Sequence, residues 1–253
     1  MTTPTVQILG VALARLSVDE AVDRALGGGL VLAPSGPGLC ALERDPHYRD
    51  ALLGSDLNLT DSGLVILAYA LTARRLLPRT SGLGYLDALL KRRELKAPGA
   101  TFWVMPSRSS VVRNLAWLRS RGYNVTEEDC YVAPHYSRTG QVVDEALLTI
   151  LTQRKPAHVL ICIGGGPQEK LGLYVKHHLP YQPGIHCIGA AIAFLNGDQT
   201  TIPRWADRLL LGWLLRCVAD PKRFVPRYLR ACRLVYLLAR YGAAAPPIVT
   251  QPR

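Results

Sequence analysis

The sequence lacks any apolar run near the roughly 20 residues that a helix needs to cross a bilayer. Even the leucine-rich residues 209–215 are flanked by Arg208 and Arg216. The first ten residues also lack the cationic segment and the following apolar segment of a signal peptide. We therefore expect no transmembrane helix and a cytoplasmic protein.

The sequence also lacks the common signatures of metal and nucleotide sites. No two of its six cysteines stand at the two-residue spacing of zinc and redox sites, so we expect them to be reduced, buried and structural. There is no Asp-x-Asp motif, no dinucleotide fingerprint and no Walker loop. We expect no metal and no cofactor, which disfavours hydride-transfer enzymes and NTPases. The cysteines are Cys40, Cys130, Cys162, Cys187, Cys217 and Cys232.

Acidic residues are scarce toward the end of the chain. The protein has 30 Lys and Arg residues against 19 Asp and Glu, a net charge of +11. From residue 204 onward the only acids are Asp207 and Asp220. This excess positive charge predicts an anionic partner: nucleic acid, phospholipid or a phosphorylated substrate. The cations are Arg204, Arg208, Arg216, Lys222, Arg223, Arg227, Arg230, Arg233, Arg240 and Arg253.

Short β-branched runs alternate with longer amphipathic segments, which is typical of an α/β protein. We expect strands at residues 6–11, 30–33, 57–60, 101–105, 125–132, 158–163 and 185–188. Helices are expected between them, including one capped by Ser17 with Glu20 as its capping-box partner and one over residues 39–53. The sequence therefore predicts a Rossmann-like parallel sheet core with helices on both faces, formed by residues 1–202.

The chain changes character after Pro203. Residues 203–241 are rich in leucine and arginine and predict a helical appendage, and residues 242–253 predict a loose tail. Apolar residues interleaved with arginines suit a helix lying at an anionic membrane surface. Packing against the main domain with a solvated basic face is the alternative.

Asp61 is the first candidate for catalysis, because it follows a predicted strand at the edge where open parallel sheets bind ligands. A carboxylate held there can take the proton from an attacking hydroxyl. The alternative is that Asp61 caps the helix that begins near Leu64. Both roles can coexist.

The turn at residues 164–166 consists of three glycines between a buried strand and a helix. Its exposed amides could hold a phosphate. His135 and Tyr136, in the loop after residue 132, could stack on a base or sugar. His177 and His178 are adjacent on a helix and cannot face one metal together.

Several segments taken in order resemble the WecG/TagA/CpsF glycosyltransferase family. Together they span roughly residues 6–230, and the ordered series is more specific than any one motif. They are residues 8–11, the 57–63 segment LNLTDSG, the 77–82 segment LPRTSG, the 166–169 segment GPQE, residues 189–197, Pro203, residues 211–214 and residues 220–229.

The resemblance implies an inverting, metal-independent enzyme that transfers a sugar from a UDP-sugar to a polyprenyl-diphosphate-linked saccharide in bacterial cell-surface or exopolysaccharide synthesis. It implies that Asp61 is the general base. The acceptor diphosphate would meet arginines at the inner face of the membrane, and self-association is possible. The implied donor-binding residues are Ser35, Arg79, Gly82, Tyr136, Gly164, Gly165, Gln168 and Glu169, and the implied arginines are Arg204, Arg208, Arg216 and Arg223.

The sequence departs from the family pattern near the expected sugar pocket. Ala33 and Ser35 replace a threonine and an asparagine, Ala193 stands where an aspartate is usual, and Gly212 where a glutamate is usual. N-acetylmannosamine transfer is therefore open, with glucose or a uronic acid as the alternatives. Two other readings also stay open: a UDP-sugar epimerase or hydrolase on the same sheet, and a nucleic-acid-binding protein with steeply salt-dependent binding.

Overall fold

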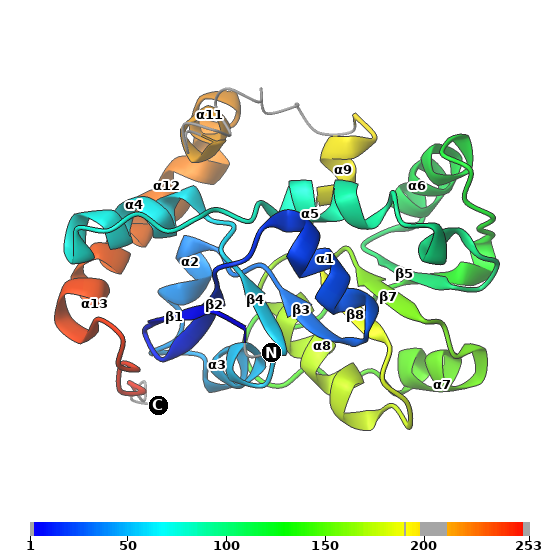
Figure 1. The fold of residues 1–253 in the computed structure, drawn as a ribbon, viewed down its shortest axis with the longest axis horizontal. Helices are drawn as coiled ribbons and strands as arrows, with labels where there is room; N and C mark the ends of the chain where they lie inside the picture. The colour runs from blue at the N-terminus through cyan, green and yellow to red at the C-terminus, as the bar shows by residue number, and fades with distance from the viewer. Residues whose placement is uncertain (1–2, 190, 198–211, 250–253) are drawn as a thin grey trace.

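The core of the protein is a mostly parallel β-sheet, as predicted. The computed structural model describes residues 3–189, 191–197 and 212–249. Its eight described strands lie in the order β1-β2-β4-β3-β8-β7-β5-β6, and of these pairs only β1 and β2 are antiparallel (Figure 1). The strands are β1 (Thr5–Ile8), β2 (Val11–Ala14), β3 (Gly29–Leu32), β4 (Leu57–Leu59), β5 (Thr101–Met105), β6 (Cys130–Val132), β7 (His158–Ile161) and β8 (Gly184–Cys187).

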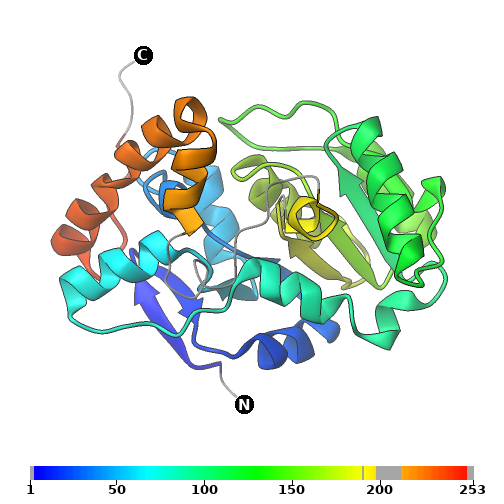
Figure 2. The ribbon, with the colours of Figure 1, turned by 90° about the horizontal axis from the view of Figure 1, so that it is seen from above.

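Helices cover both faces of the sheet, which confirms the second part of the predicted architecture (Figures 1 and 2). Successive residues of a strand point to opposite faces. Phe102 and Val104 accordingly belong to one buried cluster and Trp103 to the other. The first cluster includes α2 (Gly36–Leu39), α3 (Pro46–Leu53), α4 (Gly63–Ala73), α7 (Glu145–Arg154) and α8 (Pro167–His178); the second includes α1 (Val18–Leu26), α5 (Gly82–Leu89), α6 (Arg108–Ser120) and α9 (Ala191–Leu195).

The predicted capping box is present at the start of α1. The Ser17 hydroxyl accepts a hydrogen bond from the Glu20 amide at 3.3 Å, and the Glu20 carboxylate accepts one from the Ser17 amide at 2.8 Å. Two donors that would otherwise be unsatisfied at the helix end are thereby bonded. The helix ends at Gly27, also as predicted.

The prediction of one strand over residues 6–11 is wrong. The chain reverses at Leu9 and Gly10, whose φ angles are 51° and 81°, so that β1 and β2 form an antiparallel hairpin. The apolar pattern does not reveal this reversal, because the turn itself contains the buried Leu9 and β2 is again largely buried.

Two other element boundaries are also corrected. The helix expected over residues 39–53 is broken into α2 and α3, because Asp45 caps a new helix whose first residue is Pro46. The strand expected over residues 125–132 is limited to β6, since a 3₁₀ turn (Glu127–Asp129) precedes it.

The C-terminal part described is helical, as predicted, and comprises α11 (Gly212–Ala219), α12 (Pro221–Ala231) and α13 (Arg233–Tyr241). Helix α13 contacts α4 and α2, and Leu234 and Leu237 are fully buried in the core. None of the described helices is long and apolar enough to cross a membrane.

The described residues after α13 form backbone hydrogen bonds with the core, and the loose tail expected over residues 242–253 stays a prediction. The amides of Leu9 and Gly10 donate to the carbonyls of Gly242 and Ala243 at 2.9 and 2.8 Å. The amide of Val249 donates to the Glu43 carbonyl at 2.7 Å. The proposed division at residues 202 and 241 stays a prediction, and residue 203 lies outside the described part.

Candidate active site

The predicted site residues gather at one edge of the sheet because they follow the carboxyl ends of parallel strands. Ser35 follows β3, Asp61 follows β4, and the glycine turn at 164–166 follows β7. Strand β3 pairs with β4 and with β8, and β8 pairs with β7. This is the edge at which open α/β sheets bind ligands.

Asp61 is held in place by the segment that follows α4. The Gly82 amide, at the start of α5, donates to Asp61 Oδ1 at 2.9 Å. Arg79 Nε donates to the Asp61 carbonyl at 2.7 Å, and Arg79 Nη2 lies 3.5 Å from Oδ1. Oδ2 forms no hydrogen bond with the described residues, and the side chain is 34% exposed. Among the described residues, hydrogen bonds to Oδ1 and to the backbone carbonyl therefore fix the group, and Oδ2 is left without such a bond.

The alternative role of Asp61 as the N-cap of α4 is wrong. The cap is Ser62, whose hydroxyl accepts from the Val65 amide at 3.4 Å. The same hydroxyl accepts from the Gly36 amide at 3.2 Å, which joins the start of α4 to the start of α2. Ser35 caps α2 by accepting from the Gly38 amide at 3.2 Å. Thus the Ser35 and Asp61 loops are fixed beside each other.

Two buried threonines bring Arg79 to this edge. The Thr80 amide donates to the Thr60 carbonyl at 3.0 Å, so the 77–81 segment lies along the end of β4. The Thr60 hydroxyl donates to the Ala14 carbonyl at 2.7 Å, and the Thr80 hydroxyl donates to the Leu16 carbonyl. Sequence reasoning did not single out either threonine. A buried hydroxyl that bonds a distant carbonyl has no local signal.

The glycine turn is held by a residue in the first turn of α8, the helix that follows it. The Glu169 carboxylate is buried and accepts from the Gly166 amide at 2.6 Å and from Gln168 Nε2 at 3.2 Å. Burial raises the pKa of Glu169, and these hydrogen bonds partly offset the rise. Gly164 and Gly165 remain exposed. A methyl group at Gly164 would meet no atom within 4 Å, so the turn leaves open space at the edge.

Tyr136 is tied to Asp144 rather than extended toward the sheet edge. Its hydroxyl donates to Asp144 Oδ2, and the hydroxyl of Tyr131 donates to the same carboxylate at 3.0 Å. Burial, followed by this hydrogen bond, raises the pKa of Tyr136. The hydroxyl is therefore already hydrogen-bonded within the protein. Any contact of Tyr136 with a sugar donor would therefore be made by its ring.

Lys170 connects the Tyr136 loop to the glycine turn. Its ammonium group donates to the Arg138 carbonyl at 2.9 Å and lies 3.1 Å from Asp45 Oδ2. The lysine is almost fully buried, so the start of α8, the cap of α3 and the loop after β6 meet at one point. Sequence reasoning missed this residue, because a lysine one position after a capping Glu looks like an ordinary surface residue.

The predicted cationic residues of the C-terminal segment are only partly placed. Arg204 and Arg208 lie outside the described residues. Arg216 lies within α11 and Arg223 within α12, and the positions of their side chains are also outside the description. Their predicted contact with an acceptor diphosphate therefore stays a prediction.

The described part of the chain shows the state of the cysteines and the arrangement of possible metal ligands. All six cysteines are free thiols; Cys162 and Cys187 are buried, whereas Cys232 is exposed. Burial of cysteines was thus predicted correctly for only some of them. Among the described residues, no three His, Cys, Asp or Glu side chains lie close enough to hold a metal ion.

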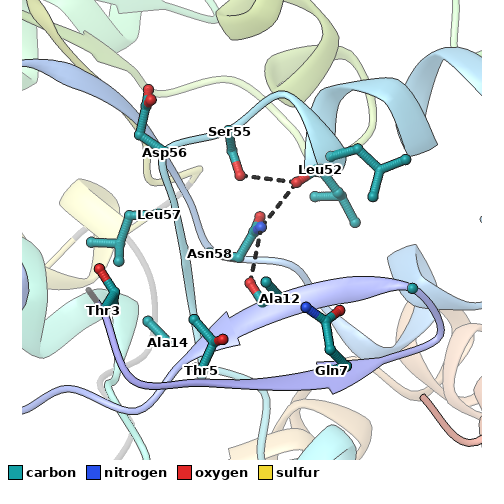
Figure 3. Close-up of a pocket in the computed structure, with 12 residues that line it drawn as sticks. Thr3, Thr5, Gln7, Ala12, Ala14, Leu52, Ser55, Asp56, Leu57 and Asn58 are labelled. Atoms are coloured by element: carbon teal, nitrogen blue, oxygen red, sulfur yellow. Dashed lines mark hydrogen bonds between the residues drawn. The ribbon is translucent and has the colours of Figure 1, made fainter. Parts of the chain in front are cut away.

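A cavity of about 240 Å³ lies away from these residues, between the β1–β2 hairpin and the segment that leads into β4 (Figure 3). It is lined by the β1–β2 hairpin and by residues 52–58, including Asp56, which precedes β4, whereas Asp61 follows it. Asn58 bridges the diverging β2 and α3 segments here by donating to the Ala12 and Leu52 carbonyls at 3.3 and 2.9 Å. This cavity is separate from the candidate site.

The fold and the edge together define an α/β protein of the open-sheet type whose ligand site holds a partly exposed carboxylate next to an arginine. A family model described as "Glycosyl transferase WecG/TagA/CpsF family" matches residues 6–246. The chain therefore belongs to this glycosyltransferase family, and the resemblance deduced from its ordered motifs is confirmed. Membership decides against the epimerase and hydrolase readings.

The chain is also similar to an N-acetylglucosaminyldiphosphoundecaprenol N-acetyl-beta-D-mannosaminyltransferase of Bacillus spizizenii. The two are 22% identical over 221 residues, which cover 83% of this chain and 80% of the relative. The relative, by its name, transfers a mannosaminyl group to a lipid-linked saccharide.

Proposed function

We propose that this glycosyltransferase moves a sugar from a UDP-sugar to a polyprenyl-diphosphate-linked saccharide, with inversion and without a metal, at the cytoplasmic face of the cell membrane. Asp61 acts as the general base. The observation that carries the proposal is the partly exposed Asp61 carboxylate, in which Oδ1 is bonded to the Gly82 amide and Oδ2 has no hydrogen bond to the described residues. A base fixed in this way can accept the proton of an attacking hydroxyl without first reorienting.

Inversion follows from a single displacement. The acceptor hydroxyl attacks the anomeric carbon from the face opposite UDP, its proton passes to Asp61 Oδ2, and the bond to the UDP oxygen breaks. The leaving diphosphate needs positive charge and N–H donors. Arg79 beside Asp61 and the exposed amides of the glycine turn at residues 164 and 165 are the groups assigned to that task.

The lipid-linked acceptor is supported by the name of the similar Bacillus enzyme and by the basic C-terminal helices. A polyprenyl diphosphate combines an anionic group with a membrane-embedded chain. Arginines bind such diphosphates through paired N–H donors. We assign this role to Arg204, Arg208, Arg216 and Arg223.

The donor sugar is proposed to differ from N-acetylmannosamine. Ala33, one of the departures from the family pattern, lies at the site: a methyl group at Gly82 would be 3.6 Å from the Ala33 Cβ atom and 3.3 Å from Asp61 Oδ2. A small apolar side chain there removes a hydroxyl that could bind a sugar substituent. Glucose or a uronic acid is the proposed donor sugar.

A donor screen tests the function. Each UDP-sugar is offered with a short-chain polyprenyl-diphosphate-linked saccharide, with and without EDTA, and the products are weighed by mass spectrometry. We expect one donor to add one sugar mass to the acceptor and the addition to persist in EDTA. Release of free sugar without acceptor modification would contradict transfer, and loss of product in EDTA would contradict metal independence.

A further inference from the structure

Helix α4 exposes leucines on the face that points away from the core. Val65, Ile66 and Ala68 are buried, whereas Leu71 is 70% exposed and Leu67, one turn earlier, is also exposed. The helix contains no charged residue over Gly63–Ala73. A surface helix ordinarily carries polar residues on its outer face, so this composition needs an explanation beyond folding.

The segment that forms this face supplies cations and no acids in its sequence. Arg74, which ends α4 in a left-handed conformation, and Arg75 are both exposed, and Leu76 after them is 72% exposed. Between Asp61 and Asp87 the chain has three arginines and no acidic residue. We call Leu67, Leu71, Leu76, Arg74 and Arg75 the α4 surface.

The C-terminal helices beside α4 also expose large apolar side chains. Helix α4 contacts α11 and α13, and Figures 1 and 2 place all of these helices at one end of the molecule. These helices and α12 expose further large apolar side chains: Leu214 and Val218 on α11, Val225 and Leu229 on α12, and Tyr236 on α13. Contiguous exposed apolar area with cations is typical of an interaction site.

We propose that the α4 surface is a second membrane contact, in which leucines enter the interface of an anionic bilayer and Arg74 and Arg75 meet its head groups. The absence of acids over 25 residues favours an anionic surface over a protein partner of mixed charge. The inference rests on the proposed lipid-linked acceptor. It also explains the position of α4, which begins two residues after Asp61 and so connects the base to the bilayer over about 16 Å of helix.

The test measures binding of the full chain to vesicles by co-sedimentation. Vesicles contain phosphatidylglycerol and phosphatidylcholine in equal amounts, or phosphatidylcholine alone. The test variant is Leu71→Gln with Leu76→Gln, and the control is Leu53→Gln, which changes a leucine that is 55% exposed at the end of α3, beside the separate cavity. Glutamine adds no charge, and exposed positions leave the fold unchanged, which thermal unfolding verifies.

We expect the double variant to bind mixed vesicles at least about tenfold more weakly than the wild type. Each replaced leucine no longer contributes the free energy gained when an apolar side chain moves from water into the bilayer. Leu53→Gln should bind as the wild type does, and Arg75→Gln should weaken binding to mixed vesicles but not to neutral ones. Equal binding of wild type and double variant, or no wild-type binding, would overturn the proposal. A change of oligomeric state in sedimentation with unchanged vesicle binding would make the surface an interface between copies instead.

Transfer assays separate this inference from the proposed function. The double variant should keep wild-type transfer to a short-chain acceptor in solution and lose transfer to a long-chain acceptor held in vesicles. If the wild type transfers no sugar to any acceptor while the vesicle binding difference persists, the proposed function fails and the membrane contact stands.

Discussion

At the scale of single residues, the candidate site depends on how one carboxylate is oriented. Asp61 Oδ1 is fixed by the Gly82 amide, and its backbone carbonyl is fixed by Arg79. The orientation of Asp61 therefore depends on two residues, Arg79 and Gly82, that lie about 20 positions further along the chain. Oδ1 is thus bonded within the protein, whereas Oδ2 has no hydrogen bond to the described residues. This difference between the two oxygens yields two predictions.

Replacing Asp61 by asparagine should lower turnover on the order of 10²- to 10⁴-fold, because an amide cannot accept the proton while its oxygen can still bind the Gly82 amide. Steady-state transfer assays measure the effect, and thermal unfolding should be unchanged. Asp87→Asn, which neutralises an exposed carboxylate of the same α5 helix, is the control and should remain fully active. Near-wild-type turnover of Asp61→Asn would remove Asp61 from its role.

Gly82→Ala tests the orientation rather than the charge. A methyl group at Gly82 would lie 3.3 Å from Asp61 Oδ2, so the carboxylate must shift. We expect a loss of turnover on the order of tenfold or more, since small misplacements of reacting groups are costly. Gly84→Ala, on the same helix, places its methyl group in ordinary contact at 3.7 Å and should be active. Similar rates for both variants would contradict the orientation argument.

At the scale of elements, the β1–β2 hairpin is where the C-terminal segment joins the core. The turn residues Leu9 and Gly10 donate backbone hydrogen bonds to Gly242 and Ala243. A hairpin turn with positive φ angles at both positions points its amides outward, where another segment can accept from them. The hairpin turn thus contacts the residues that directly follow α13.

We predict that Gly10→Ala destabilises the protein by about 1–3 kcal/mol, measured by urea unfolding. Its φ angle is +81°, and its methyl group would lie 2.6 Å from the Ala245 Cβ atom. Gly99→Ala, at a φ of +69° with no atom within 4 Å, carries the backbone strain alone and should cost less. Equal losses would mean that the contact with residue 245 contributes nothing.

At the scale of the whole molecule, a buried series of hydrogen bonds joins the neighbouring strands β7 and β8 to α5. Tyr85 lies 2.8 Å from His186 Nδ1, and His186 Nε2 lies 3.2 Å from His158 Nδ1. Burial, the largest cause, lowers the pKa of His186 to about 3, and the pKa of His158 is also lowered by burial. Both imidazoles are therefore neutral in the folded protein.

The buried neutral histidines in this hydrogen-bonded series predict a loss of stability in mild acid. The unfolded state binds protons on these histidines below about pH 6.5, while folded His186 resists protonation until about pH 3. Stability should therefore fall as the pH decreases through this window, by about 1.4 kcal/mol per pH unit for His186. His158, whose pKa is also lowered, acts in the same direction. Glu169, whose pKa is raised by burial, acts in the opposite direction.

Urea unfolding of the wild type and of His186→Gln between pH 7 and pH 5 measures the contribution. The variant lacks the titrating group, so its stability should depend less steeply on pH. His135→Gln, at an exposed loop position, is the control and should keep the wild-type slope. Equal slopes for the wild type and His186→Gln would contradict the prediction.

The α/β class, most strand positions, the capping box of α1 and the family could be read from the amino-acid sequence, because these follow from local periodicity, capping chemistry and ordered motifs. The sequence also placed Asp61 and the glycine turn at a sheet edge, since both follow buried strands. Only the tertiary structure decided that Ser62 caps α4, that the chain reverses at Gly10, and that Lys170 joins three segments. The Lys170 contacts join residues far apart in the chain, which no local pattern encodes, whereas the Ser62 cap and the turn at Gly10 are local features whose position the apolar pattern does not mark.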